Sequence, residues 1–152
     1  MRIVEDDLTG PEISALLRYH IEQMQLNSPL GSVFAFDIDR LRAADVTFWT
    51  IWDGDVLTGC GALRQIDAAN GEIKSMRTAP DHVRAGVATA LLDHIIGVAR
   101  HAGYRRLSLE TGSGPAFEPA LAFYRRRGFV DGEAFGDYER SAFNQFLHLE
   151  IL

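Results

Sequence analysis

The most regular pattern of hydrophobic and polar positions lies between residues 71 and 100. The first part, Gly71–Thr78, is predicted to be a strand, and Pro80 marks a sharp turn after it. From about Gly86 onward, apolar residues recur at steps of three or four, the spacing of an amphipathic helix, at Val87, Leu91, Ile95 and Val98. The pattern therefore predicts a strand, a short polar loop and a long helix.

The remaining elements follow from periodicity, turn signals and helix breakers. We expect strands at residues 1–8, Val46–Trp52, Val56–Arg64, Arg106–Thr111, Phe129–Ala134 and Asn144–Ile151. We expect further helices from a capping box at Thr9–Glu12 to about Gln25, over Asp37–Ala44 and over Pro119–Arg127. The order β-α-α-β-β-β-α-β-α-β-β predicts an α/β fold, with a mixed sheet and helices on both faces.

The loop before the long helix has small residues where its backbone would have to approach a ligand. Gly86 and Ala88 leave N–H groups at the start of the helix uncovered, and these donors favour an anion together with the helix dipole. Arg84 strengthens this prediction, because a guanidinium binds phosphate through two parallel hydrogen bonds. The alternative is a tight turn that needs small residues for its own geometry.

The composition fits one globular domain over residues 1–152. Apolar residues make up 47% of the chain and charged residues 24%, and 21 acidic against 15 basic side chains give a net charge of −6. This balance disfavours a nucleic-acid partner and an anionic membrane surface. A polyanionic ligand would therefore have to be bound by a local positive site.

Two further features concern the compartment. Cys60 is the only cysteine, so no disulfide can form within the chain, and we expect a buried, inert thiol and a cytoplasmic protein. The first ten residues, MRIVEDDLTG, lack the apolar region of a secretory signal. No run approaches the ~18 apolar residues that a membrane span needs.

A second motif follows the long helix. The stretch Ala120–Phe129 has the pattern A-x-x-F-Y-x-x-x-G-F. Together with the loop before the long helix, it resembles the GNAT superfamily of acetyl-CoA-dependent N-acetyltransferases, over essentially the whole chain. The likeness is greatest to a small single-domain bacterial branch with the strings E-I-K-S-M-R-T, L-E-T-G and F-G-D-Y, which stand here at Glu72–Thr78, Leu109–Gly112 and Phe135–Tyr138.

The resemblance implies a mixed, mostly antiparallel sheet and acetyl-CoA as cosubstrate. It implies that main-chain groups of Met76–Thr78 bind the thioester carbonyl and pantetheine arm, beside a splay between this strand and the next. The residues expected to contact the cosubstrate are Met76, Arg77, Thr78, Arg84, Ala85, Gly86, Val87, Ala88, Thr89, Phe117 and Tyr124. Two positions depart from the family pattern, since Val83 stands where the loop usually opens with Arg or Gln, and Phe117 where many relatives have Asn.

Acetyl transfer needs a base for the amine and an acid for the departing thiolate, because an alkylammonium with a pKa of about 10.4 is protonated at neutral pH. We expect Glu72 to be the base, and the resemblance implies a water relay. Glu110 is its competitor, and a solvated strand-end carboxylate is the structural alternative for Glu72. Tyr124 is the expected acid, since a phenol with a pKa of about 10 keeps its proton. A structural tyrosine is the alternative.

Other charged residues have two interpretations each. Lys74 and Arg77 are unusual in a central strand, so they either hold a substrate carboxylate or extend to the sheet edge. The run Arg125–Arg127 suits the end of a helix, and contact with a coenzyme A phosphate is the alternative. The histidines have no ligand spacing, so we expect no metal: His20, His82, His94, His101 and His148.

The predicted function is direct acetyl transfer in a ternary complex to a small amine, with a carboxylate-bearing amine as one option. We expect Ser28–Phe36 and Asp131–Tyr138 to form the walls of the acceptor groove. Two alternatives stay open: a coenzyme A-binding domain without turnover, and acyl transfer to a hydroxyl group. A homodimer is also left open.

Overall fold

The computed structural model describes residues 1–29 and 38–151 of the chain. Its strands and helices follow one another in the order that the sequence predicts. The strands are β1 (Arg2–Glu5), β2 (Val46–Asp53), β3 (Val56–Gln65), β4 (Asn70–Thr78), β5 (Arg106–Thr111), β6 (Val130–Asp131) and β7 (Gln145–Glu150). The helices are α1 (Pro11–Leu26), α2 (Ile38–Leu41), α3 (Val87–His101) and α4 (Glu118–Arg126), and η1 (Pro80–His82) is a single 3-10 turn.

The predicted boundary between the first strand and the first helix is wrong, and the cause is local. The strand ends before residue 8, because Asp6 Oδ1 accepts a hydrogen bond from the N–H of Leu8 at 2.7 Å and turns the chain. The predicted capping box does not form. The Thr9 hydroxyl instead donates to Asp7 Oδ1 at 2.6 Å, and the N-cap of α1 is Gly10, which has no side-chain cap bond.

Two more elements are shorter than predicted. The helix expected over Asp37–Ala44 ends at Leu41, and its first residue lies outside the described residues, as does most of Ser28–Phe36. The strand expected over Phe129–Ala134 stops at Asp131. The next residue, Gly132, lies against the His148 ring, because a Cβ added to Gly132 would be 2.6 Å from Cδ2 of that ring.

The seven strands form one sheet in the order β1-β2-β3-β4-β5-β7-β6. All neighbours are antiparallel except β4 and β5, which run parallel. This confirms the mixed, mostly antiparallel sheet. The parallel pair follows from the connection between these strands, because α3 carries the chain back to the end where β4 began.

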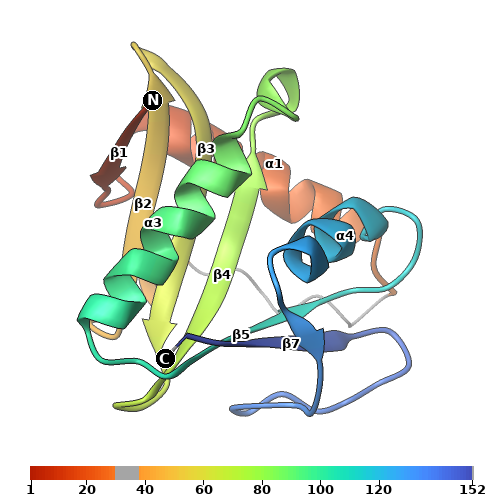
Figure 1. Cartoon of the computed structure of the whole chain (residues 1–152). Helices are drawn as coiled ribbons and strands as arrows, with labels where there is room; N and C mark the ends of the chain where they lie inside the picture. The colour runs from red at the N-terminus through yellow and green to blue at the C-terminus, as the bar shows by residue number, and fades with distance from the viewer. Residues whose placement is uncertain (30–37, 152) are drawn as a thin grey trace.

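Helices cover both faces of the sheet, as predicted. Figure 1 shows α3 in front of the sheet and α1 behind it. On the α3 face, α3 and α4 share one core with the sheet, in which Leu92 and Leu121 are buried. On the α1 face, Leu17 of α1 and Leu41 of α2 pack in a second core around Phe48. In the described part of the chain, none of the helices has the length and apolar character that a bilayer crossing requires.

The feature that positions the site is the divergence of β4 from β5. The two strands pair only from Asn70 and Arg106 to Glu72 and Ser108. Beyond this point β5 and β7 turn away from the direction of β4 (Figure 1). On its other side β4 has a bulge against β3, where Ser75 has a φ of 58°. Among the described residues, the carboxyl half of β4 therefore has no partner strand on its β5 side.

Candidate active site

The helix α3 begins at a left-handed turn. Its N-cap Gly86 has a φ of 83°, and Arg84 has a φ of 64°. No side-chain hydrogen bond caps this end, and a Cβ added to Gly86 would meet no atom of the described residues within 4 Å. The start of the helix therefore borders open space, and helix N-termini of this kind bind anions.

Packing holds the start of α3 against the free half of β4. A Cβ added to Gly59 of β3 would lie 2.7 Å from Cγ1 of Val87, which is buried at the first position of α3. Gly59 pairs in turn with Thr78 at the end of β4. The structure thus brings together two segments that the sequence analysis assigned to the cosubstrate, the loop before α3 and Met76–Thr78.

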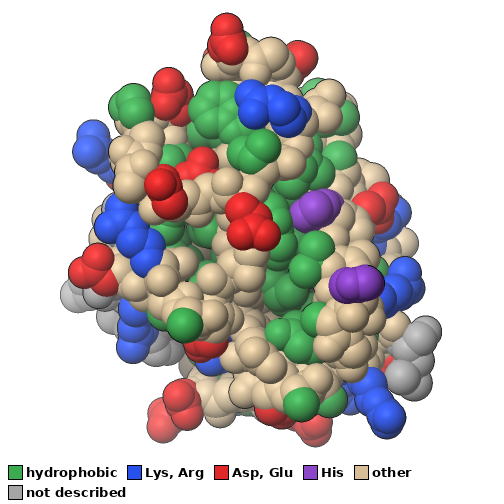
Figure 2. All heavy atoms as spheres, turned by 90° about the vertical axis from the view of Figure 1, so that its left-hand side faces the viewer, with side chains coloured by type: hydrophobic (Ala, Val, Ile, Leu, Met, Phe, Trp, Pro, Cys, Tyr) green, Lys and Arg blue, Asp and Glu red, His purple; other side chains and the backbone are tan. Residues whose placement is uncertain are grey.

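Two of the three arginines that end α4 are paired within the chain. Arg125 Nη2 lies 3.0 Å from Asp131 Oδ2, and this pairing raises the pKa of the guanidinium. Arg127 pairs with Asp93 of α3. On the face that Figure 2 shows, cations and carboxylates are scattered mainly around a largely hydrophobic middle. The exposed Arg84 is therefore a local cation at the loop, within an acidic protein.

Glu72 is a buried residue in the middle of the sheet, only 1% exposed, and not a solvated strand-end carboxylate. Its Oε1 accepts a hydrogen bond from Arg64 Nε at 2.9 Å. Its Oε2 accepts a hydrogen bond from the Tyr138 hydroxyl at 2.6 Å and lies 3.6 Å from Lys74 Nζ. Both carboxylate oxygens are therefore occupied by partners within the chain.

Glu110, two residues past the last pairing with β4, is half-buried. Burial raises the pKa of its carboxyl group to about 7, with a further increase from the charge of Glu72. A hydrogen bond from Asn144 and the charge of Lys74 partly oppose this shift in pKa. A carboxylate with a pKa near neutrality is suited to general base catalysis.

Arg77 is held by the first helix. Its Nε donates a hydrogen bond to Nδ1 of His20 at 2.8 Å, and its guanidinium lies 5.6 Å from the centroid of the Tyr19 ring. Burial, and then the charge of Arg77, lower the pKa of His20 to about 3, so this imidazole is neutral. The side chain of Arg77 thus lies under α1 and does not extend to an edge of the sheet.

Tyr124 is 7% exposed and packs in the core of the α3 face. Its ring stands edge-on to Phe129, with 5.4 Å between centroids. Burial raises the pKa of its phenol, and the nearby charge of Arg77 partly opposes that shift. The hydroxyl group therefore keeps its proton at neutral pH.

Phe117 occupies the position where many relatives have Asn. It is 7% exposed, and its ring lies edge-on to Phe143 at 5.4 Å. A Cβ added to Gly112 would lie 2.7 Å from its Cζ. The Phe117 side chain thus packs in the same core as Tyr124.

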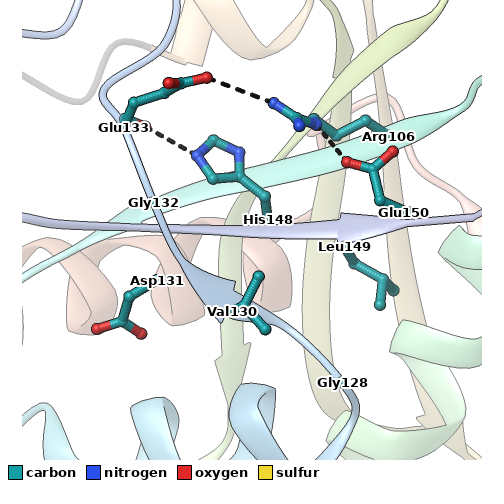
Figure 3. A pocket seen from close by; sticks show the side chains of 9 residues that line it. All are labelled: Arg106, Gly128, Val130, Asp131, Gly132, Glu133, His148, Leu149 and Glu150. Atoms are coloured by element: carbon teal, nitrogen blue, oxygen red, sulfur yellow. Dashed lines mark hydrogen bonds and ion pairs between the residues drawn. The ribbon is translucent and has the colours of Figure 1, made fainter.

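A hollow of about 460 Å³ lies at the other end of the sheet, around β6 and β7 (Figure 3). His148 Nε2 donates to the carbonyl oxygen of Glu133 at 2.8 Å, and its Nδ1 is hydrogen-bonded to the Ser108 hydroxyl at 2.7 Å. A serine paired with a histidine is a nucleophile pattern, but Ser108 is only 2% exposed. The pair therefore ties β5 to β7.

The partners that fix these groups could not all be predicted from the sequence. Arg64 and Glu72 face each other across a predicted hairpin, so opposite charge at paired positions was a usable signal. Tyr138 stands in the F-G-D-Y string but lies 66 positions from Glu72, and local pattern cannot show such a contact. His20 stood out in the sequence only as one of the histidines without ligand spacing.

The comparisons with known proteins agree with this architecture. The sequence model described as "Acetyltransferase (GNAT) family" matches residues 13–129. Two similar relatives are the uncharacterized N-acetyltransferases YsnE of Bacillus subtilis strain 168 and YedL of Escherichia coli K12. YsnE is 50% identical over 138 residues, 91% of each chain. YedL is 46% identical over 149 residues, 98% of this chain and 94% of YedL.

A solved structure shows the same fold. The GNAT family acetyltransferase from Elizabethkingia anophelis with acetyl-CoA bound aligns with a TM-score of 0.69 and 17% identity. The alignment covers 98% of this chain and 97% of that one. The family match, the two relatives and the shared fold confirm the resemblance seen in the sequence. The chain belongs to the GNAT family of acetyltransferases and is an acyltransferase.

Proposed function

We propose that the protein transfers the acetyl group of acetyl-CoA to the amine of a small-molecule acceptor, by direct attack in a ternary complex. The observation that carries this proposal is the open start of α3 beside the unpaired half of β4. An anion site lies next to main-chain groups of β4 that no strand of the described residues pairs with on the β5 side. This arrangement suits a ligand with a phosphate end and an amide-rich arm. The neighbour from Elizabethkingia anophelis, which has acetyl-CoA bound, supports this cosubstrate.

The residues fit the two parts of this cosubstrate. N–H groups of the segment 84–89 would hold the pyrophosphate, with Arg84 as the nearby cation. Main-chain groups of Met76–Thr78 would hold the pantetheine arm and the thioester carbonyl in the gap between β4 and β5. Bound there, the cosubstrate supplies the activated acetyl group.

The environment favours Glu110 over Glu72 as the general base. Both oxygens of Glu72 already bind Arg64, Tyr138 and Lys74, so this carboxylate positions its neighbours. Glu110 combines partial burial with a pKa of about 7, which lets it take a proton and release it near neutral pH. We therefore assign proton removal from the amine to Glu110, and a structural role to Glu72.

Tyr124 would act at the leaving group, as Glu110 would at the amine. The amine nitrogen attacks the thioester carbon, the carbon–sulfur bond breaks, and the sulfur leaves as a thiolate. The phenol of Tyr124 keeps its proton because burial raises its pKa, so it can protonate that thiolate. The released amine proton resides on Glu110, and the phenolate that remains regains a proton from solvent after release.

The proposal is tested by incubating the protein with acetyl-CoA and a panel of small amines. Thiol release is monitored together with the mass of the acceptor. Acetylated amine and free thiol in equal amounts would support the proposal. Tight acetyl-CoA binding without thiol release for any acceptor would favour a sensor domain, and acetyl esters without amides would favour a hydroxyl acceptor.

A further inference from the structure

Arg77 is a half-buried cation that lacks a carboxylate partner within the part of the chain that the structure describes. Its hydrogen bond goes to the imidazole of His20, and its stacking partner is the ring of Tyr19. None of the ion pairs among the described residues includes it. Buried charges in proteins are normally paired, because desolvation without a counter-ion is costly. The place beside Arg77 therefore favours an anion that comes from a ligand.

The two neighbours hold this guanidinium in place without neutralising it. His20 accepts at Nδ1 and is neutral, and Tyr19 presents the face of its ring. With Nε engaged, the Nη groups are the donors that remain for a ligand. A guanidinium fixed through Nε is pre-organised for a planar, two-oxygen anion such as a carboxylate.

Other cations on the same face are already compensated. Arg64 binds Glu72 Oε1 at 2.9 Å, and Lys74 Nζ lies 3.6 Å from Glu72 Oε2 and 3.4 Å from the Tyr138 hydroxyl. This distinguishes Arg77 from Lys74, although the sequence suggested the same role for both. An incoming anion would have to compete with Glu72 at Lys74, whereas no carboxylate of the described residues pairs with Arg77.

Arg77 and Glu110 line the same face of the sheet, on either side of the gap. Arg77 pairs with Cys60, and Lys74 pairs with Ala62, and both of these β3 residues belong to the core under α1. Glu72 therefore lies on this α1 face as well, and it pairs with Ser108. Side chains alternate along a strand, so Glu110, two residues beyond Ser108, points to the same face.

We propose that the acceptor is a small amino acid-like molecule, and that Arg77 binds its carboxylate while its amine faces Glu110. This inference rests on the proposed acetyl transfer and adds the chemical class of the substrate. The acceptor needs both groups, because the cation and the base stand on the two strands that flank the gap. Arg77 would then be a specificity-determining residue.

The first test needs only the wild-type protein. Each of a set of small amino acids is compared with its own carboxamide, which keeps the amine and the side chain but loses the negative charge. We expect kcat/KM for the best amino acid to exceed that of its carboxamide by at least roughly 10-fold, because charge-assisted hydrogen bonds are lost. Equal rates for acid and amide across the set would overturn the inference while leaving acetyl transfer intact.

The second test compares Arg77→Gln with Arg77→Lys and with the control Arg18→Gln. Arg18 is an exposed cation on α1, so this control removes one positive charge without touching the proposed subsite. In Arg77→Gln the acid-to-amide ratio of kcat/KM should fall roughly 10–10²-fold, toward one, mostly through KM for the acid. Arg77→Lys should restore part of the ratio, and Arg18→Gln should leave it as in wild type.

Two results would reassign Arg77. A fall in kcat that is equal for acids and amides, with the ratio unchanged, would mean that Arg77 stabilises the departing thiolate. Loss of acetyl-CoA affinity in Arg77→Gln, measured by calorimetry, would place the anion of the cosubstrate there. A protein that binds acetyl-CoA but acetylates no amine would instead refute the proposed function itself, and the substrate class with it.

Discussion

The hydroxyl of Tyr138 donates a hydrogen bond of 2.6 Å to Oε2 of Glu72, across 66 positions of sequence. The contact joins the segment before β7 to the first half of β4. It also leaves Glu72 with a full set of partners, since Arg64 binds its other oxygen. A carboxylate held in this way fixes the surrounding side chains, and this gives the first prediction.

Glu72→Gln should lower the stability of the protein. The change leaves the half-buried Arg64 and Lys74 without their negative partner, which should lower the free energy of unfolding by roughly 1–3 kcal/mol. Denaturant unfolding curves measure this loss. A variant as stable as wild type, with activity reduced 10²-fold or more and no acidic limb in its pH profile, would show that Glu72 is the base after all.

Glu110→Gln should mainly affect catalysis. The base must be deprotonated to accept a proton, so kcat/KM of the wild type should rise with pH through about 7 and then level off. The variant should lose roughly 10²–10⁴-fold in kcat/KM above that pH and have a flat acidic limb. A wild-type profile with its midpoint near the ordinary pKa of a glutamate would contradict this assignment.

The carboxyl group of Glu110 should also affect how the stability of the protein depends on pH. Its pKa is raised in the folded state to about 7, above the ordinary value of 4.5, so the folded protein binds the proton more tightly than the unfolded chain. The stabilisation that this tighter proton binding gives the folded state is fully present below the pKa of the unfolded chain. It is lost as pH rises through about 7. Glu110→Gln should therefore raise Tm relative to wild type at pH values above 7 more than in acid. Parallel Tm curves for the two proteins would argue against the raised pKa.

Tyr124→Phe separates catalysis from binding. The variant keeps the ring and its contact with Phe129 and loses only the hydroxyl, so acetyl-CoA affinity should be nearly unchanged. The expected loss is in kcat, by roughly 10–10³-fold, because the thiolate leaves without its acid. Tyr104→Phe is a matched control away from α4. Equal kcat for Tyr124→Phe and wild type would remove this phenol from the reaction.

Gly86→Val should weaken acetyl-CoA binding. Gly86 has a φ of 83°, which a β-branched residue adopts only with strain, and the new side chain would occupy the open space before α3. The control is Gly97→Ala inside α3, where a Cβ meets nothing within 4 Å among the described residues. That control should gain roughly 0.5–1 kcal/mol of stability without a change in affinity. Calorimetry on the folded variants decides, and unchanged affinity in Gly86→Val would exclude the loop as the pyrophosphate site.

Sequence pattern predicted most of the fold because each long element buries one face. Leu91 and Ile95 are at most 1% exposed, so the helical period of α3 is unambiguous. The pattern failed where a side chain had two local partners available, as when Thr9 bonded to Asp7 instead of capping α1. Such choices depend on a single hydrogen bond and leave no periodic signal.

The candidate site was predicted in part. Motifs predicted the elements on which the loop before α3 and the acidic and phenolic candidates lie, and the structure has these elements. They did not show that Glu72 is buried under Tyr138, or that Arg77 binds His20 across 57 positions. Burial shifts the pKa of a side chain, and a hydrogen-bond partner occupies its oxygen. Both effects come from segments that meet only in the folded protein.

The short pairing of β4 with β5 also affects how the protein unfolds. Among the described residues, strand pairing between β1–β4 and β5–β7 is limited to three residue pairs, Asn70–Arg106 to Glu72–Ser108. Across this seam the molecule depends on interdigitated side chains such as Leu107 and Leu109, and little on main-chain hydrogen bonds. In the wild type we expect amide hydrogens of both parts of the sheet to exchange through one cooperative opening. Mutations that weaken the packing of those side chains should make each part open, and exchange its amide hydrogens, independently of the other.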